Sequence, residues 1–421
     1  MIRGNRAYQL FLVATLLSFV GSTVHVLAAS WLILSLTGVA YSVPLLLLFS
    51  AVPGVLLAPV VGSVVDRFDP RVLLIVVDVI SAAAVFSIPL ASSADLLVPW
   101  HLYAVESILA LCGQFYGSAS RVFVNRLAAP DELLAANATT TLVYQLGIAF
   151  GALGGGLVVA TAGPLTGLLV NGVSFLLSGV GMAAIGLTRQ WKAATPPAVE
   201  PAERTGAWQG FVNTGRLMIG HRRILHMTLL YVGLQSMHRL LSSLLAPYVS
   251  AGGHGAGTQG GLQMSYSLGA VLAGGLIPLI TRRFGAAAIL LIGSVGVAGL
   301  AVAFSFTSDW TGILTYGALG LAVSAWIYHL TAAQLLVPAK QQGTYFATTG
   351  SLVSLAGIVV FGAGTLLLHT LEPRTVYWIG AAALLATALP SLLATRRAPD
   401  PTAAEPGRPA LKDPEPDRSQ A

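Results

Sequence analysis

The sequence predicts an all-α membrane protein with twelve transmembrane helices in two six-helix halves. The first observation is composition: 55% of the 421 residues are apolar, 9% are charged, and the mean hydropathy is +0.78. A soluble domain usually carries about 25% charged residues, so lipid must solvate much of this apolar surface. The second observation is the spacing of the polar breaks, and the third is the placement of Lys and Arg.

Polar breaks divide the chain into twelve apolar segments. A bilayer core requires about 20 apolar residues per helix, and each segment is close to that length. The first segment is too long for a signal peptide and lacks a small-residue cleavage site, so we expect it to be retained. The predicted spans run near 8–36, 43–61, 72–91, 97–117, 138–160, 165–187, 224–249, 262–281, 286–306, 310–336, 346–368 and 375–395.

Lys and Arg fall on one side of these spans. With the N-terminus in the cytoplasm, twenty of the 22 Lys and Arg residues lie inside, Arg374 lies outside, and Arg239 lies within a span. This is the positive-inside pattern, and it predicts that both termini are cytoplasmic. The net charge of +6 is explained by the same pattern, so no nucleic-acid partner is expected.

The longest interior polar stretch, 188–223, separates six spans from six. Its first part contains three prolines and is typical of a flexible linker. Its second part places Trp208, Phe211 and Val212 at helical spacing, which favours a helix along the inner membrane face. The predicted units are an N-terminal half (1–187), a cytoplasmic linker (188–223), a C-terminal half (224–395) and a disordered cytoplasmic tail (396–421).

The decapeptide GSVVDRFDPR at 62–71 concentrates charge in a chain that has little of it, and it forms the short turn between the second and third spans. G-x-x-x-D-R-x-x-x-R is the signature of this turn in the major facilitator superfamily, which the sequence resembles. The residues that match are Gly62, Asp66, Arg67 and Arg71.

The resemblance covers all twelve spans, strongly in the first half and loosely in the second. The segments AVPGVLLAPVVGSVVDRFDPRVLLIVVD, PDELLAAN (130–137) and NGVSF (171–175) resemble the drug-efflux branch that contains macrolide exporters and the enterobactin exporter. QLLVPAKQQG (334–343) also resembles it, although the branch usually has Gly-Arg where this chain has Gly343-Thr344. The second-half copy of the decapeptide is reduced to TRRFG (281–285).

The resemblance implies a conformational role for the decapeptide. A small residue at Gly62 permits close helix contact, and Asp66 can accept hydrogen bonds from a helix N-terminus and from an arginine. We expect these residues to latch the two halves together on the cytoplasmic side. Asp78 lies about two turns into the third span and is expected to serve this latch. The alternative is a solubilising turn that only obeys the positive-inside rule.

The fifth span carries GIAFGALGGG (147–156), which resembles the antiporter signature Gly-x-x-x-Gly-Pro-x-x-Gly-Gly. Ala152 replaces the proline of that signature. Such glycines permit close helix contact and bending, so a simple packing face is the alternative. The matching glycines are Gly147, Gly151, Gly155 and Gly156.

Polar side chains inside spans are costly and are therefore functional candidates. They fall near the middle of spans 1, 4, 7 and 10, and in the superfamily that the chain resembles these four helices line the central cavity. A structural histidine is the alternative for His25 and His329. The candidates are His25, Glu106, His238, Arg239 and His329.

Glu106 and Arg239 are the formal charges nearest the midplane, and they have opposite signs. A pair between the two halves is the simplest way to satisfy both. Glu106 is also the candidate proton carrier, because a carboxylate that alternates between a cation and an open cavity binds protons differently in the two states. A static ion pair is the alternative.

These features favour a secondary active transporter that drives small amphipathic compounds, such as antibiotics, siderophores or secondary metabolites, out of the cell with a proton gradient. The expected setting is a monomer in the inner membrane of a bacterium. The sequence shows no Walker loop, nucleophile elbow or zinc-binding pair, so we expect no enzyme activity, metal or cofactor. An importer of a small solute and a polytopic sensor that does not transport remain alternatives.

Overall fold

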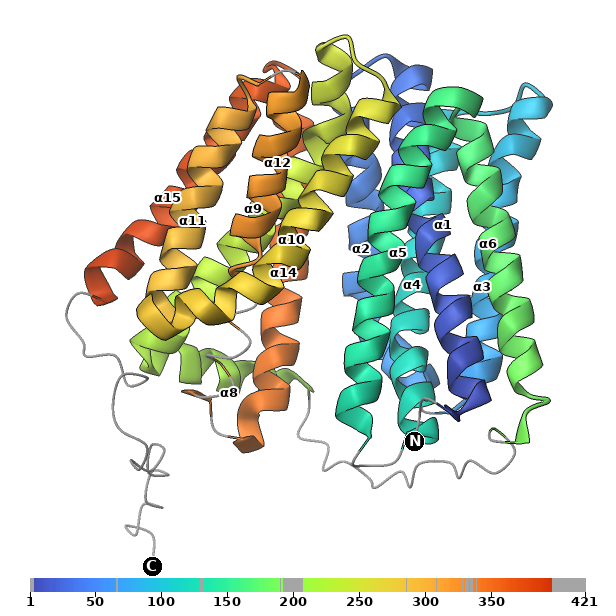
Figure 1. Ribbon diagram of the computed structural model, residues 1–421, viewed down its shortest axis with the longest axis horizontal. Helices are drawn as coiled ribbons and strands as arrows, with labels where there is room; N and C mark the ends of the chain where they lie inside the picture. Colours follow the sequence, from blue (N-terminus) through green and yellow to red (C-terminus); the bar gives the residue numbers. More distant parts are fainter. Residues whose placement is uncertain are drawn as a thin grey trace, which may run out of the picture.

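The computed structural model describes residues 4–65, 67–128, 132–189, 191, 207–284, 286–307, 309–326, 329, 333, 336, 337 and 339–395 (Figure 1). In this part of the chain the structure contains thirteen helices and no strand. The predicted all-α class is therefore confirmed. Asp66, most of the predicted linker and the predicted tail lie outside the described residues.

The first six helices form one half of the molecule, on the right in Figure 1. In it α1 packs between α5 and α6, α3 packs on α4 and α6, and α2 packs on α4. The helices are α1 (Arg6–Thr37), α2 (Ser42–Val65), α3 (Pro70–Ser93), α4 (Pro99–Leu127), α5 (Leu133–Ala162) and α6 (Pro164–Ile185).

The second half begins with the short helix α8, which confirms the helix predicted in the second part of the linker. In this half α9 packs on α14 and α15, α10 packs on α12, and α11 packs on α12 and α15. The helices are α8 (Ala207–Gly220), α9 (Arg222–Ala251), α10 (Ala256–Phe284), α11 (Ala286–Phe304), α12 (Asp309–Val323), α14 (Ala339–Leu367) and α15 (Pro373–Thr395).

Each of the twelve predicted segments overlaps a helix of the structure. The tenth differs most, because α12 ends at Val323 and a turn at 324–325 precedes further helical residues. At this turn Ala325 N–H bonds the Ala322 carbonyl three residues back, so the chain tightens out of α-helical geometry. Within the described residues, five helical stretches are long and apolar enough to cross a membrane by length and composition, and twelve spans stay a prediction.

Local sequence signals explain several helix ends. The Asn5 side chain accepts hydrogen bonds from the backbone N–H groups of Ala7 and Tyr8, which caps α1. Gly38 ends the same helix in the left-handed conformation, with φ of 68°. Asp69 caps α3 and is followed by Pro70 in the first turn, where a missing N–H costs nothing.

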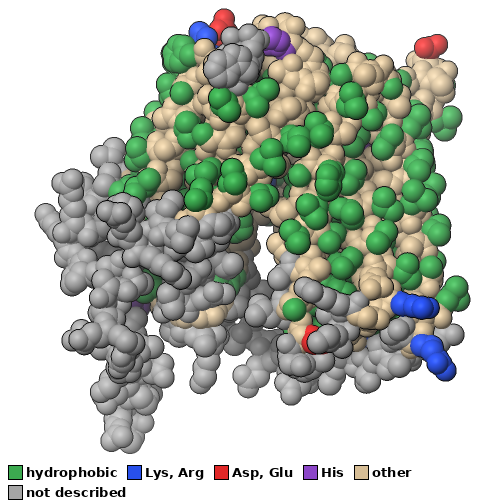
Figure 2. All heavy atoms as spheres, in the orientation of Figure 1, with side chains coloured by type: hydrophobic (Ala, Val, Ile, Leu, Met, Phe, Trp, Pro, Cys, Tyr) green, Lys and Arg blue, Asp and Glu red, His purple; other side chains and the backbone are tan. Residues whose placement is uncertain are grey.

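The outer flank of the bundle is apolar. Figure 2 shows hydrophobic side chains scattered over the whole visible flank, with charged side chains and histidine confined to the two ends. Large apolar side chains such as Leu90, Val180 and Leu366 are exposed on it. In water this much exposed apolar surface would favour aggregation, whereas in a bilayer it contacts lipid.

The two halves touch at the end of the bundle away from Arg6, which we call the closed end. There Trp31 Nε1 donates a 2.6 Å hydrogen bond to Gln259 Oε1, and the rings of Tyr41 and His369 stack 3.8 Å apart. Toward the opposite end, Figure 2 shows a gap between the described parts of the two halves.

Helix α5 meets α10 at the closed end through glycines. A Cβ atom added to Gly156 would lie 2.7 Å from Gly260 Cα, so only glycine permits this backbone approach. Pro44 of α2 and Gly364 of α14 are also neighbours at this end. In the described part of the chain, the halves therefore contact each other at the closed end and separate toward the other end.

Candidate functional site

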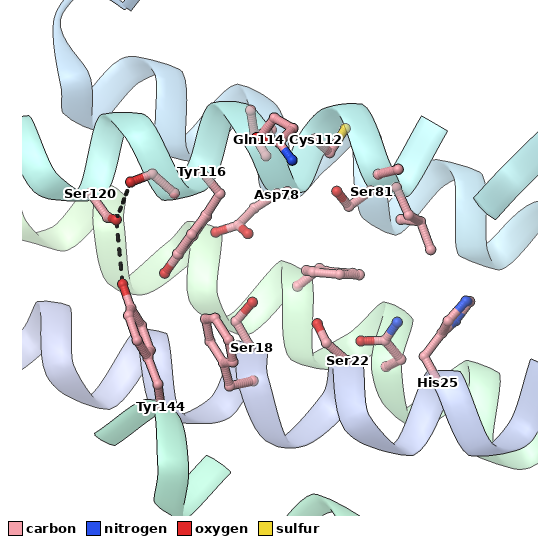
Figure 3. A pocket seen from close by; sticks show the side chains of 18 of the residues that line it. Ser18, Ser22, His25, Asp78, Ser81, Cys112, Gln114, Tyr116, Ser120 and Tyr144 are labelled. Atoms are coloured by element: carbon pink, nitrogen blue, oxygen red, sulfur yellow. Dashed lines mark hydrogen bonds between the residues drawn. The ribbon is translucent and has the colours of Figure 1, made fainter. Parts of the chain in front are cut away.

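A cavity of about 810 Å³ lies inside the first half, and α1 to α6 all contribute to its lining. Its walls combine aromatic and aliphatic side chains with several hydroxyl, amide and carboxylate groups. Figure 3 shows how the labelled side chains of α1, α3, α4 and α5 converge on this space. A cavity of this size, mostly apolar with a few convergent polar groups, is typical of a small-molecule site.

Two of the predicted candidates meet in this cavity. His25 Nε2 of α1 and Glu106 Oε1 of α4 are 2.7 Å apart. His25 is 3% exposed and Glu106 is 7% exposed, so water screens this contact little. The contact is therefore a buried, charge-assisted pair when the imidazole carries the proton.

The structure corrects the prediction that Glu106 pairs with Arg239. The carboxylate contacts His25 within its own half, and among the described residues Arg239 makes no ion pair. Arg239 instead extends along α14, where a Cβ atom at Gly357 would lie 3.0 Å from its Cδ. His25 and Glu106 lie on α1 and α4 of the same half, so Glu106 finds its partner without reaching the second half.

The two remaining histidines belong to the second half and do not line the cavity. His238 Nδ1 lies 2.6 Å from the Tyr266 hydroxyl, and His329 Nε2 lies 2.9 Å from the Tyr345 hydroxyl. The His329 ring also stacks on Tyr231 at 4.1 Å. Each imidazole thus has a hydrogen-bond partner. For His329 this agrees with the alternative that it is a structural histidine. Of the five candidates, the cavity brings together two.

Asp78 has a different place from the one we expected. Its carboxylate lines the cavity together with Glu106 and His25 and makes no hydrogen bond to the described residues of the decapeptide. The side chain is 1% exposed, and neither oxygen has a hydrogen-bond partner in the described part of the chain. Sequence position placed it two turns into α3, but the rotation of that helix directs it into the cavity.

The described part of the decapeptide makes its contacts within the first half. Arg67 is exposed, and the Arg71 guanidinium lies 3.4 Å from the Ala183 carbonyl of α6. Gly62 is helical, and Asp66 lies outside the described residues. No described contact joins the decapeptide to the second half, so the predicted latch between the halves stays a prediction.

Asp69, a further residue of the decapeptide, organises this end of the bundle. Its carboxylate caps α3 and forms an ion pair of 3.1 Å with Arg126 at the end of α4. Arg126 in turn lies 4.1 Å above the ring of Trp191, which also stacks on Phe123. We call Asp69, Arg126 and Trp191 the base cluster. It ties together α3, α4 and the segment that follows α6.

The glycines of α5 pack on two neighbours. Three of the glycines face α1: an added Cβ atom would lie 2.6 Å from Phe19 at Gly147, 2.6 Å from Val20 and Thr23 at Gly151, and 3.0 Å from Val24 at Gly155. The fourth, Gly156, faces α10. These glycines therefore form close helix contacts, as the packing alternative expects. Their part in antiport is not tested by this geometry.

Sequence reasoning missed several side chains that the cavity gathers. Ser18 and Ser22 lie on the same face of α1 as His25: Ser22 follows Ser18 by four residues, and His25 follows Ser22 by three. That helical spacing was visible in the sequence and could have identified the face. Tyr116 and Tyr144 could not be found in this way, because aromatic residues are common on lipid-facing and core-facing surfaces alike.

Comparison with known proteins decides the family. A family model described as "Transmembrane secretion effector", within the major facilitator superfamily, matches residues 4–413. The chain belongs to this family. Membership of this family makes the chain a multi-pass membrane transporter of the major facilitator type.

Individual relatives agree with this assignment. The "Multidrug efflux pump Tap" of Mycobacterium tuberculosis is 26% identical over 290 residues, which cover 64% of this chain and 63% of that protein. The same pump from Mycobacterium bovis matches equally. The chain thus matches less than two thirds of the length of these relatives.

Solved structures share the fold at low sequence identity. The nucleoside transporter NupG has a TM-score of 0.72 at 13% identity, covering 93% of this chain and 100% of that one. A bacterial homologue of the iron transporter ferroportin in its inward-facing state has a TM-score of 0.68 at 16% identity, covering 93% and 99%. These likenesses confirm the predicted major facilitator fold.

Proposed function

We propose that this chain is a proton-driven exporter of small amphipathic compounds, such as antibiotics, siderophores or secondary metabolites, that works by alternating access. Membership of the transmembrane secretion effector family supports transport, and similarity to a multidrug efflux pump supports the outward direction. The proposed setting is the inner membrane of a bacterium, with both termini in the cytoplasm and the chain acting as a monomer.

The arrangement of the halves supports alternating access. The halves touch at the closed end through Trp31 and Gln259 and separate at the other. With the termini in the cytoplasm, the closed end faces outside and the gap opens inward, so the structure represents the state that loads substrate from the cell. Rocking the halves about the central cavity would then open the closed end.

The observation that carries the proposal is the buried pair of His25 and Glu106. We propose that the carboxylate and the imidazole, in contact at 2.7 Å, hold one proton between them as a neutral unit. A second proton on this unit creates a net positive charge inside the first half, and separation from water makes that charge costly. Opening the cavity to the outside relieves the cost, so proton binding and conformation are linked.

The experiment that tests this function is a growth and accumulation assay. The chain is expressed in a sensitive bacterial strain that lacks its own pumps, and growth is compared across antibiotics and secondary metabolites of the host. We expect resistance to at least one amphipathic compound, lower cellular accumulation of that compound, and loss of both effects when a protonophore dissipates the gradient.

A matched pair of variants sharpens the result. Glu106→Gln should abolish the resistance, whereas Asp95→Asn, the same chemical change at an exposed residue of the α3–α4 turn, should retain it. Correct membrane insertion with no protection against any compound, or with increased accumulation, would contradict export.

A further inference from the structure

The carboxylate of Asp78 is the least satisfied group in the cavity. It is 1% exposed, and both of its oxygens lack a hydrogen-bond partner among the described residues. Figure 3 shows it pointing into the space between Tyr116 and Ser18. An ionised carboxylate that is buried without a partner is strongly disfavoured, so this group either takes up a proton or pairs with a cation that reaches it.

No cation of the cavity lining is available to Asp78. Two lining side chains can carry a positive charge, His25 and Arg121. The Nε2 of His25 is engaged with Glu106, and Arg121 is exposed. The other titratable groups of the lining are Glu106, Cys112, Tyr116 and Tyr144, and none of them becomes a cation. Since no described side chain forms an ion pair with Asp78, a ligand can supply its positive partner.

The surroundings of Asp78 fit an organic cation better than a bare metal ion. Phe19, Tyr116, Tyr144 and Phe175 line the same cavity, and aromatic faces attract organic cations. The volume of about 810 Å³ accommodates a drug-sized body. In the part of the chain that the structure describes, no group of three His, Cys, Asp or Glu side chains could hold a metal ion.

The ammonium end of such a ligand would enter among polar groups. Asn171 of α6 lines the cavity and is fully buried, and the hydroxyl-bearing Ser18 and Ser81 line it as well. Gly179 lets α6 approach Asp78 closely, since a Cβ atom there would lie 3.5 Å from Asp78 Cβ. The carboxylate and the polar oxygens of the lining can accept hydrogen bonds from an ammonium group. The aromatic side chains of the same cavity can contact the apolar body that carries it.

From this juxtaposition we propose that Asp78 binds the protonated amine of an amphipathic substrate. The proposal rests on the proposed transport function and names the class of compound that the cavity takes. It separates two tasks within one cavity. Asp78 receives the charged group of the substrate, and the His25–Glu106 pair handles the proton.

The test uses two probes with the same aromatic body, one with a protonated amine and one with a neutral acetamide. Propranolol carries a secondary amine that is protonated at neutral pH, and N-acetylpropranolol has the same aromatic body with a neutral amide. Binding to the purified full chain is measured by isothermal titration calorimetry without a pH gradient. We expect the wild-type protein to bind the amine about tenfold more tightly than the amide, a difference of about 1.4 kcal/mol.

Asp78→Asn should weaken amine binding about tenfold and leave amide binding unchanged, because it removes one charge and keeps the side-chain shape. Asp95→Asn is the matched control and should bind both probes as the wild type does. The comparison of the two probes on the wild-type protein stands even if Asp78→Asn fails to fold.

Three results would overturn the proposal: equal wild-type affinity for the two probes, no wild-type binding of propranolol, or equal weakening of both probes by Asp78→Asn. Because binding is measured without a gradient, a failure of proton-driven export leaves these results interpretable. Export that fails while Asp78-dependent amine binding persists would count against the proposed function alone.

Discussion

The indole N–H of Trp31 donates a 2.6 Å hydrogen bond to the side-chain carbonyl of Gln259, and this bond joins α1 of one half to α10 of the other. It lies at the closed end, beside the approach of Gly156 to Gly260. In alternating access the closed end must open during the cycle, so this bond has to break. The residue pair therefore sets part of the balance between the two states.

Removing this bond should shift the balance toward a state open at the closed end. Trp31→Phe keeps an aromatic ring and loses the donor, and Gln259→Leu loses the acceptor. A net contribution of about 0.5–1.5 kcal/mol predicts a shift of roughly two- to tenfold in the ratio of states. Spin labels at Asp95 and Thr370, both exposed at this end, report the distance by pulsed electron resonance. Unchanged distance distributions in both variants would contradict the prediction.

The packing of α5 on α1 should tolerate no methyl group at Gly151. A Cβ atom there would lie 2.6 Å from both the Val20 carbonyl oxygen and Thr23 Cβ, so the helices must separate. We expect Gly151→Ala to destabilise the protein by about 1–3 kcal/mol. Gly154→Ala is the control, since nothing lies within 4 Å of its Cβ position. Thermal unfolding of the purified variants tests this, and equal melting temperatures would refute it.

The base cluster allows the two roles of Asp69 to be separated. Asn at this position can still cap α3 but cannot form the ion pair with Arg126, whereas Ala can do neither. We expect Asp69→Asn to lose less than about 1 kcal/mol, as for other exposed pairs, and Asp69→Ala to lose about 1 kcal/mol more. Chemical unfolding of the purified variants measures the free energy that each one loses relative to the wild type. Equal losses in both variants would show that the cap contributes nothing.

The proposed orientation predicts which residues an impermeant maleimide reaches in intact cells. Asp95→Cys lies in the turn after α3, at the closed end, and should be labelled from outside. Leu187→Cys follows α6 at the other end, is 81% exposed, and should react only after permeabilisation. The native Cys112 is buried and does not compete. The reverse labelling pattern would place the termini outside.

Helices were predictable from the sequence because the bilayer imposes a length on every apolar segment. Each predicted segment overlaps a helix, and the caps at Asn5 and Asp69 mark starts that local chemistry determines. The exception near Val323 reflects a local tightening of the chain that hydropathy does not record. The family was predictable because the decapeptide combines charge, glycine and spacing in one short turn.

The partners within the cavity were not predictable in the same way. Sequence gives the depth of a residue along a span but not the direction in which its helix is turned. Glu106 was therefore assigned to Arg239 by charge alone, whereas the fold brings it to His25. Asp78 was assigned to the nearby turn, whereas the rotation of α3 directs it into the cavity.

Coupling of protons to transport through Glu106 can be measured as gradient-driven export from proteoliposomes. Glu106→Gln keeps a polar contact for His25 but cannot carry a proton. With a substrate identified by the growth assay, we predict that this variant binds the substrate and exchanges it downhill, yet loses accumulation driven by a pH gradient, while Asp95→Asn retains all three. Undiminished gradient-driven export by Glu106→Gln would contradict the account.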